Sequence, residues 1–234
     1  LKAHKILSKT KMCLYAGSLV PREILSIVPK EAKLIDTSDL TMKQIEQLYI
    51  RAKELNVDVA RVHSGDVSVY GALSEQINLL QKHNIDFQIV PGIPAYVEAA
   101  AQLKTELTAP GQVQSVVLTR TSFGSTPMPE GEDLKTFAKT GATLVIHLSI
   151  RRLNYIYREL TPILGDDALV AVLYRIGWPD QQIILDRLDN IASKVREKKI
   201  TRTALIITGK NFKKKSDINS VLYDENFNHL FRPK

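Results

Sequence analysis

Short apolar runs alternate with amphipathic stretches through the first half of the chain, and this alternation constrains the fold more than any other feature. Strands are predicted near residues 12–16, 33–36, 57–63 and 87–90. Between them, apolar residues recur at helical spacing near residues 42–55 and 70–83, and Thr41 is the expected N-cap of the first of these helices. Strands that alternate with helices need crossover connections, which predicts a mostly parallel sheet.

A second alternating unit follows residues 107–113, where Pro110 and Gly111 interrupt regular structure. Its strands are predicted near residues 115–119, 143–148, 168–174, 182–186 and 203–208. Helices near residues 134–140, 153–164 and 188–198 separate most of them. The predicted fold class is therefore α/β, with one α/β domain over residues 1–110 and a second over residues 111–234. Residues 211–234 are polar and basic and are expected to form a sheet-edge excursion or a loose tail.

The composition limits the compartments in which the protein is expected to work and the kinds of partner that it is expected to bind. The 234 residues contain no apolar run of roughly 18 residues, so no transmembrane helix is expected. No signal-peptide pattern is found, and the single cysteine, Cys13, fits a reducing compartment, which together predict a cytoplasmic protein. The net charge of +7 suits either a nucleic acid or a small polyanionic substrate. Aromatic residues make up only 6% and do not interleave with the basic runs, which argues against a platform for stacking nucleic-acid bases.

Several chemistries lack their sequence signatures. No G-x-G-x-x-G and no P-loop occurs, so the usual nicotinamide-dinucleotide and NTP fingerprints are missing. The five histidines are far apart, and no His/Cys cluster has metal-ligand spacing. The G-x-S-x-G pattern of a nucleophile elbow is absent as well. The sequence thus nominates no metal ion and no catalytic nucleophile.

The turn at residues 63–71, His-Ser-Gly-Asp-Val-Ser-Val-Tyr-Gly, lies where a strand should lead into a helix. Ligands of open α/β sheets bind at such carboxyl ends of strands. Gly65 would let a ligand approach the backbone, and the Asp66 carboxylate could accept hydrogen bonds from sugar hydroxyls or an amine. The alternative is structural, with Asp66 as the N-cap of a helix that begins near Val69.

Four further segments also follow predicted strands and would meet ligands at the same kind of edge. They are LYAGSLV (residues 14–20), VPGIPA (90–95), LTR followed by TPMPE (118–130), and YRIGWPDQ (174–181). Taken in this order with RVHSGDVSVYG, and with ALIITG at residues 204–209, they resemble the tetrapyrrole methyltransferases. The closest resemblance is to the precorrin-4 (cobalt-precorrin-4) C-11 methyltransferases of cobalamin synthesis, and it runs from about Leu1 to Gly209.

The resemblance implies two α/β domains with S-adenosylmethionine in the cleft between them, a homodimer, and a tetrapyrrole polycarboxylate as substrate. Carried over by motif, one set of residues would bind the cofactor: Gly65, Asp66, Val69, Tyr70, Pro94, Ala95, Leu148, Ile176 and Ala204. A second set would bind the tetrapyrrole: Tyr15, Gly17, Ser18 and Arg120. Because the sulfonium methyl and the ring carbon are already reactive, no residue is expected to serve as an obligatory acid or base.

The chain departs from the family pattern at several places. The Gly-rich strand-loop that normally precedes the helix starting at Leu1 is absent from these residues. Val67 replaces the usual proline, Pro94 replaces a small hydroxyl residue, and Ile176-Gly177 replaces Ala-Thr. Three alternatives therefore stay open. They are a methyltransferase of the uroporphyrinogen III type, a degenerate relative that binds ligand without transferring methyl, and a basic nucleic-acid-binding protein.

Overall fold

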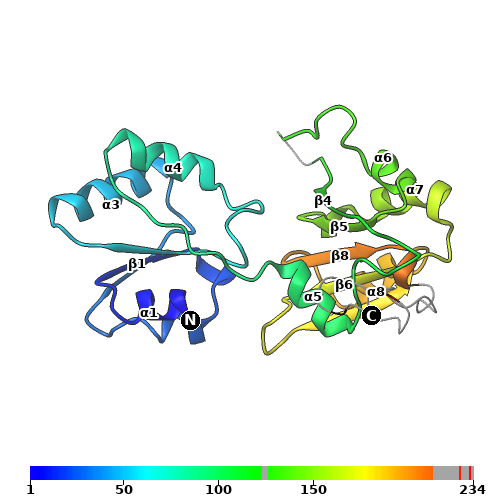
Figure 1. Cartoon of the computed structure of the whole chain (residues 1–234), viewed down its shortest axis with the longest axis horizontal. Helices are drawn as coiled ribbons and strands as arrows, with labels where there is room; N and C mark the ends of the chain where they lie inside the picture. The colour runs from blue at the N-terminus through cyan, green and yellow to red at the C-terminus, as the bar shows by residue number, and fades with distance from the viewer. Residues whose placement is uncertain (123–125, 213–226, 228–231, 233–234) are drawn as a thin grey trace. The chain divides into compact units, whose positions relative to one another are not determined.

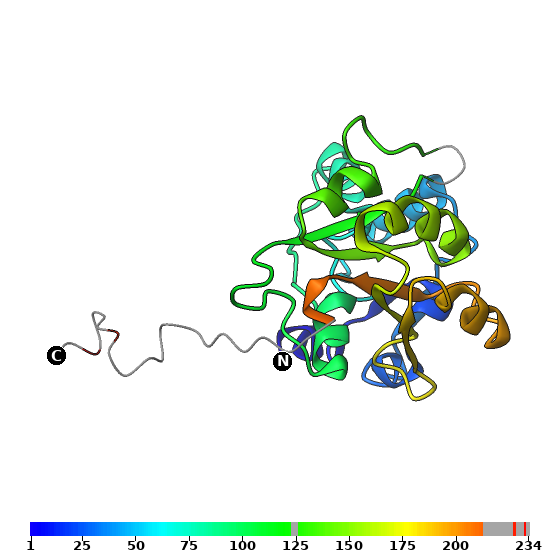
Figure 2. The ribbon, with the colours of Figure 1, turned by 90° about the vertical axis from the view of Figure 1, so that its right-hand side faces the viewer.

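The structure is a computed structural model that describes residues 1–122, 126–212, 227 and 232 (Figures 1 and 2). Contacts divide the chain into two compact units, Leu1–Ala95 and Tyr96–Lys234. The domain boundary predicted between residues 110 and 111 falls inside the second of these units, because helix α5 (Ala95–Leu103) makes its contacts there. The tail predicted over residues 211–234 lies almost entirely outside the described residues.

The first unit is built on a three-stranded parallel sheet with strand order β2-β1-β3. Its strands are β1 (Met12–Tyr15), β2 (Lys33–Asp36) and β3 (Val59–Val62). The central strand carries Cys13 and Leu14, whose side chains are fully buried on opposite faces of the sheet. This alternation explains why both faces need helical cover.

Helices cover both faces of this sheet (Figure 1). The regular elements are α1 (Lys2–Leu7), η1 (Gly17–Leu19), α2 (Arg22–Leu25), α3 (Met42–Glu54) and α4 (Leu73–Lys82). Helix α3 packs Ile45, Tyr49 and Ala52 onto the Leu14 face, and α1 packs Leu7 onto the Cys13 face. Thr41 is confirmed as the N-cap of α3, where it forms a reciprocal capping box with Gln44.

The strand predicted at residues 87–90 is wrong. Residues 85–94 have no regular secondary structure and join no sheet. The apolar side chains of Phe87 and Ile89 are each 44% exposed. The alternation of apolar residues indicated a strand here. The segment does not form one, because it has no partner strand to supply a ladder of hydrogen bonds.

The second unit contains a five-stranded sheet with strand order β4-β5-β8-β6-β7. The strands are β4 (Val116–Arg120), β5 (Thr143–His147), β6 (Leu169–Tyr174), β7 (Gln182–Arg187) and β8 (Ala204–Thr208). Only β4 and β5 are parallel, whereas β8 runs antiparallel to both β5 and β6, and β7 antiparallel to β6. The prediction of a mostly parallel sheet is therefore wrong for this unit. The short link between β6 and β7 permits only an antiparallel pair, because a parallel crossover needs a dozen or more residues.

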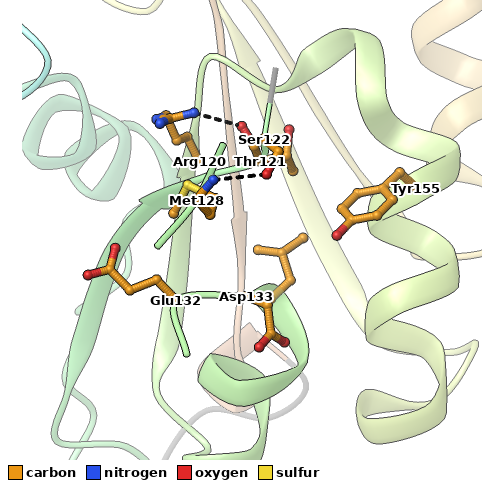
Figure 3. A pocket seen from close by; sticks show the side chains of 8 residues that line it. Arg120, Thr121, Ser122, Met128, Glu132, Asp133 and Tyr155 are labelled. Atoms are coloured by element: carbon orange, nitrogen blue, oxygen red, sulfur yellow. Dashed lines mark hydrogen bonds between the residues drawn. The ribbon is translucent and has the colours of Figure 1, made fainter. Parts of the chain in front are cut away.

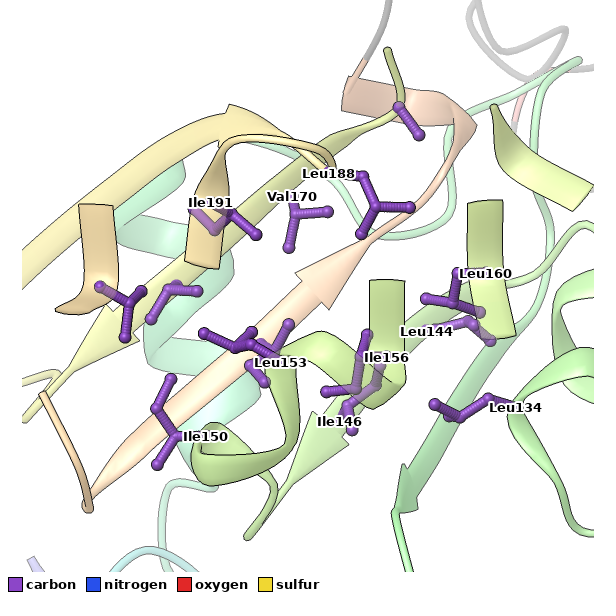
Figure 4. Packing of buried hydrophobic residues seen from close by; sticks show 14 of the residues in the cluster. Leu134, Leu144, Ile146, Ile150, Leu153, Ile156, Leu160, Val170, Leu188 and Ile191 are labelled. Carbon is purple, nitrogen blue, oxygen red and sulfur yellow. The ribbon is translucent and has the colours of Figure 1, made fainter. Parts of the chain in front are cut away.

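Three helices bury the main core of this unit (Figure 4). They are α6 (Leu134–Lys139), α7 (Leu153–Leu164) and α8 (Ile191–Glu197), with the short turns η2 (Ile150–Arg152) and η3 (Lys210–Phe212) beside them. Ile156 and Leu160 of α7 are fully buried against Leu144 and Ile146 of β5. None of the helices in the described part of the chain has the length and apolar character that a bilayer crossing demands.

Candidate functional site: the carboxyl edges of the two sheets

The carboxyl ends of the three strands in the first unit are tied together by polar contacts. Tyr15 pairs with Asp36 on one side and with Val62 on the other. Thr37 donates to the carbonyl oxygen of Tyr15 from its amide and from its hydroxyl, each at 2.9 Å. Arg61 in turn donates from Nη1 to the hydroxyl oxygen of Thr37 at 2.7 Å. The exits of β1, β2 and β3 therefore form one connected edge.

Gly17 lies on this edge with φ +40°, a backbone conformation that suits glycine. A Cβ atom there would lie 2.9 Å from Cβ of Ser38 and 3.2 Å from Oδ1 of Asp36. Hydrogen bonds from Ser38 lower the pKa of Asp36, so this carboxylate is ionised at neutral pH. Tyr15 and Gly17 are thus brought together as predicted, and Ser18 follows in η1.

Asp66 does not cap a helix. Its Oδ1 accepts hydrogen bonds from the amide of Ser68, at 2.9 Å, and from the Ser68 hydroxyl, while its Oδ2 accepts from the amide of Gly92 at 2.6 Å. Those three donors, led by the Ser68 hydroxyl, lower the pKa of Asp66. Helix α4 begins only at Leu73, after Ala72 in the left-handed region. The predicted capping role is therefore wrong, and Asp66 instead joins two distant segments.

At this junction the backbones of Gly65 and Gly92 lie in close contact. A Cβ atom on Gly92 would lie 1.9 Å from the carbonyl oxygen of Gly65, which leaves no room for any side chain. Gly65 has φ +66°, and its Cβ position is 3.7 Å from the amide nitrogen of Ala95 and 3.8 Å from Cα of Pro94. Four residues predicted from separate motifs are therefore adjacent in the first unit: Gly65, Asp66, Pro94 and Ala95.

Two residues at the end of the turn have unusual backbone dihedral angles. Tyr70 has φ 55° and Ala72 has φ 48°, although neither residue is a glycine. The Tyr70 side chain is 47% exposed, and Val69 donates from its amide to the carbonyl oxygen of Asp66 at 3.4 Å. Non-glycine residues in the left-handed region cluster at functional sites, where the surrounding structure holds them in place. The turn is thus shaped by more than the need to start α4.

A second edge is formed in the second unit by the carboxyl ends of β4, β5 and β6 and the amino end of β8. Arg120 pairs with His147, and Tyr174 pairs with Ala204. Leu148, directly after β5, has φ 52° and is 70% exposed. A branched apolar side chain held open in a strained conformation is the outlier that most indicates a binding surface.

The loop after β6 is held rigidly. The Arg175 guanidinium stacks over the ring of Trp178 at 3.8 Å and donates from Nε to Asp180 at 2.8 Å. The amide of Gly177 donates to Oε1 of Gln181 at 2.9 Å. Ile176, half-buried within this loop, therefore has a fixed backbone. Leu148, Ile176 and Ala204, which the family resemblance assigns to the adenosyl group, all lie at this edge of the sheet.

Arg120, predicted as a candidate for the tetrapyrrole side, holds its own loop. Its Nη1 donates to the carbonyl oxygen of Thr121 at 3.2 Å (Figure 3). Nη1 also donates to the carbonyl oxygen of Thr126 at 3.0 Å, and Nη2 donates to that of Pro127 at 3.3 Å. The guanidinium thus clamps the loop that follows β4. Below this loop lies a small cavity, of about 30 Å³, that reaches Tyr155 of α7.

Two histidines lie at the strand ends in surroundings that disfavour the charged ring. Burial lowers the pKa of His63, and the nearby Arg61 charge lowers it further. Burial likewise lowers the pKa of His147. Within the described ranges, no group of three or more His, Cys, Asp or Glu side chains is placed to hold a metal ion. The edges therefore offer hydrogen-bonding backbone, one clamped loop and apolar surface.

The sequence reasoning missed several of these residues. Thr37 and Arg61 connect the strand exits, yet Thr37 belongs to none of the motifs and Arg61, the first residue of RVHSGDVSVYG, was not singled out. The polar run Asp36-Thr37-Ser38-Asp39 after an apolar strand was the available signal for the first of them. Gly92 was noted only as part of a turn, although its close approach to Gly65 fixes the junction.

Comparisons with known proteins identify the family of this chain. The family model described as Tetrapyrrole (Corrin/Porphyrin) Methylases matches residues 1–192. A precorrin-4 C(11)-methyltransferase from Sinorhizobium sp is 42% identical over 232 residues, which cover 99% of this chain and 92% of that relative. A cobalt-precorrin-4 C(11)-methyltransferase from Methanocaldococcus jannaschii is 38% identical, with coverages of 99% and 90%.

Two solved structures share the fold. The structure of a cobalt precorrin-4 methyltransferase superposes with a TM-score of 0.86 at 32% identity, covering 89% of this chain and 87% of that one. A uroporphyrin-III C-methyl transferase from Thermus thermophilus, complexed with S-adenosyl homocysteine, gives a TM-score of 0.75 at 23% identity and 91% coverage of both chains. The family match and the high identity over nearly the whole length lead to one conclusion: the chain belongs to the tetrapyrrole (corrin/porphyrin) methylases.

Proposed function

We propose that this protein is an S-adenosylmethionine-dependent methyltransferase that methylates carbon 11 of precorrin-4 or cobalt-precorrin-4 in cobalamin biosynthesis. The observation that carries the proposal is the identity of 38–43% to relatives of that name over at least 95% of this chain. The other candidate substrate, uroporphyrinogen III, is named for a relative that is only 27% identical.

The residues of the first unit suit a nucleoside-type cofactor. Around Gly65 and Gly92 two stretches of backbone approach without intervening side chains, so a ligand bound beside them would meet backbone instead of bulky side chains. Asp66 keeps lone pairs beyond those that bond Ser68 and Gly92, so it can accept further hydrogen bonds. We assign cofactor binding in this unit to Gly65, Asp66, Val69, Tyr70, Pro94 and Ala95.

In the second unit we assign contacts with the adenosyl group to Leu148, Ile176 and Ala204. Leu148 presents open apolar surface, and the clamped loop fixes the position of Ile176. Tyr15, Gly17 and Ser18 remain our candidates for the tetrapyrrole side. Arg120 acts there through the loop that it clamps, and not as a free cation.

The cofactor supplies a methyl group that its sulfonium already activates. The protein's own task is to bind, to orient and to exclude water, and well-oriented reactants can contribute roughly 7–11 kcal/mol toward the barrier. The positive-φ residues Tyr70 and Leu148 suit this task, because they fix side chains on a preorganised surface. No side chain is required as a general acid or base.

We further propose that the protein works in the cytoplasm as a homodimer. The buried free thiol of Cys13 suits a reducing compartment. Its partner is a small polycarboxylate, and the net charge of +7 favours binding such an anion. Nucleic acid is not part of this proposal.

The test is a methyl-transfer assay with the full chain, using precorrin-4, cobalt-precorrin-4 and uroporphyrinogen III in parallel. Mass spectrometry of the product and calorimetric titration with S-adenosylhomocysteine provide the two readouts. We expect transfer to one of the precorrin-4 forms and to no other substrate. Transfer only to uroporphyrinogen III would replace the substrate, and binding of S-adenosylhomocysteine without any transfer would identify a degenerate relative.

A further inference from the structure

Arg61 places a half-buried cation at the carboxyl edge of the first sheet. It lies on β3, and its Nη1 donates to the hydroxyl oxygen of Thr37 at 2.7 Å. Thr37 follows β2, and β1 lies between β2 and β3, so the guanidinium reaches from β3 across the exit of β1. Thr37 also holds the carbonyl oxygen of Tyr15, the last residue of β1. The charge of Arg61 therefore lies beside the exit at Tyr15.

The guanidinium of Arg61 has more hydrogen-bond donors than the described residues fill. An arginine side chain carries five N–H donors, and Thr37 accepts from one of them, on Nη1. Nε is buried and has no hydrogen-bond partner among the described residues. Nη2 has no partner there either, but it is not enclosed and can meet a ligand. Since a buried donor without an acceptor costs free energy, this cation favours an acceptor beyond those that the described residues supply.

No carboxylate among the described residues neutralises Arg61. Burial lowers the pKa of Arg61, and the neighbouring Tyr49 and Cys13 offset this only in part. Burial raises the pKa of both neighbours, so each keeps its proton and is uncharged at neutral pH. Asp36, on the same edge, accepts from the amide of Ser38 at 2.8 Å and forms no ion pair with Arg61. One positive charge therefore lies at the exit of β1 without an opposite charge paired to it in the described part of the chain.

A carboxylate is the ligand that suits this cation best. Its two oxygens match the planar fork of a guanidinium and can accept from Nη1 and Nη2 together. Partial burial of Arg61 strengthens such a pair, because its surroundings screen charge less than water does. Under the proposed function both ligands carry carboxylates, the tetrapyrrole on its side chains and S-adenosylmethionine on its amino-acid end. The exit of β1 favours the tetrapyrrole, since Tyr15 and Gly17 there are the candidates for the substrate side.

We infer that Arg61 binds one carboxylate of the tetrapyrrole at the exit of β1, and that Thr37 holds the guanidinium in place for this contact. The inference rests on the proposed function, because that function makes the substrate a polycarboxylate. Arg61 is thus a binding residue for the substrate. Thr37 is a positioning residue that acts through Arg61.

The first test measures steady-state kinetics in Arg61→Gln and Thr37→Val. Arg51→Gln is the matched control for a lost charge, since Arg51 is exposed on α3 of the same unit. We expect KM for the precorrin-4 substrate to rise roughly tenfold in Arg61→Gln, as loss of a hydrogen bond to a charged group implies, and severalfold in Thr37→Val. The kcat and the Kd for S-adenosylhomocysteine should match those of the control. A KM at the control value in Arg61→Gln overturns the inference, and the same result in Thr37→Val alone removes the positioning role of Thr37.

A second readout does not depend on methyl transfer and distinguishes a carboxylate contact from a purely structural role. Uroporphyrin III, a stable polycarboxylate tetrapyrrole, and its methyl ester are titrated into the parent chain, Arg61→Gln and Arg61→Lys. We expect the affinity for the free acid to fall roughly tenfold in Arg61→Gln and less in Arg61→Lys, which keeps the charge, while the affinity for the ester stays unchanged. An equal loss for acid and ester, no loss for the acid, or no binding by the parent overturns the contact.

The last titration separates the two sources of a carboxylate. S-adenosylhomocysteine and methylthioadenosine, which lacks the carboxylate, are titrated into the same variants. We expect Arg61→Gln to bind both as the parent does. Weaker binding of S-adenosylhomocysteine alone would assign Arg61 to the cofactor and overturn the substrate contact. A parent that transfers no methyl but shows the acid-specific loss with uroporphyrin III defeats the proposed function alone.

Discussion

The amide nitrogen of Gly92 lies 2.6 Å from Oδ2 of Asp66, although the two residues are 26 positions apart in the sequence. This hydrogen bond joins the turn after β3 to the segment that leads into α5. The backbone of Gly65 lies against Gly92 at the same place, so the junction is held by a charged hydrogen bond and by close backbone packing.

Replacing Asp66 by Asn tests the junction. Asparagine can still accept from Ser68, but its amide group would face the Gly92 N–H, so one of the two connections is lost. We expect S-adenosylhomocysteine to bind roughly tenfold more weakly, because a hydrogen bond to a charged acceptor is removed. Calorimetry measures the change, with the exposed Asp86→Asn as control. Affinity equal to that of the parent would remove Asp66 from the cofactor site.

Replacing Gly92 by Ala should separate the two backbone segments. The new Cβ would lie 1.9 Å from the Gly65 carbonyl oxygen, and a backbone atom cannot move aside as a flexible side chain can. We expect a loss of about 1–3 kcal/mol in the free energy of unfolding, as for other overpacked sites, measured by urea denaturation. Gly131→Ala measures the cost of backbone strain without a clash, since Gly131 has φ +81° and no atom near its Cβ position. A free energy of unfolding in Gly92→Ala equal to that of the parent would show that the contact does not matter.

Replacing Arg120 by Lys should loosen the loop after β4. A single ammonium group cannot reproduce the fork that holds the carbonyl oxygens of Thr121, Thr126 and Pro127. We expect a higher KM for the tetrapyrrole with little change in S-adenosylhomocysteine affinity, and faster cleavage of the loop in limited proteolysis. Arg196→Lys provides the control. If KM rises while the cleavage rate stays that of the parent, Arg120 contacts the substrate directly.

Acidification should destabilise the protein through its buried histidines. Burial lowers the pKa of His63 and His147 in the folded state, whereas both rings titrate near 6.5 in the unfolded chain. Below about pH 6.5 the unfolded chain therefore binds more protons than the folded state does. The free energy of unfolding falls as the pH falls. Urea midpoints between pH 7.5 and 5 measure this slope. His147→Gln should flatten it, and a slope in His147→Gln equal to that of the parent would contradict this role of His147.

The sequence predicted most elements because periodicity and capping are local. Helix α7 has the predicted bounds of residues 153–164, and Thr41 caps α3 through the local pair that it forms with Gln44. Strand direction is not local. The buried strand β8 reads as an apolar run in either orientation, so its antiparallel insertion between β5 and β6 was not visible in its own residues.

In the candidate site, too, local features could be predicted from the sequence, whereas contacts between distant residues could not. Glycine and aspartate at residues 65 and 66 indicated a ligand turn, because that residue pair has a chemical meaning at a strand end. The partner of Asp66 could not be predicted from the sequence, since Gly92 lies 26 residues away in a segment that reads only as a turn after a strand. The family resemblance assigns Arg120 to the substrate side, but the three backbone carbonyl oxygens to which it donates could not be predicted from the sequence, because the loop brings them to the guanidinium in space.

The place of β8 in the second sheet has a consequence for biosynthesis. The strand at residues 204–208 is central in space but follows both of its neighbours in the chain, and it pairs with one edge of each of them. Until it emerges from the ribosome, β5 and β6 each expose one unpaired, strongly apolar edge. The nascent second unit is thus prone to aggregation until β8 has been synthesised, and termination before residue 204 should yield chains that aggregate or are degraded.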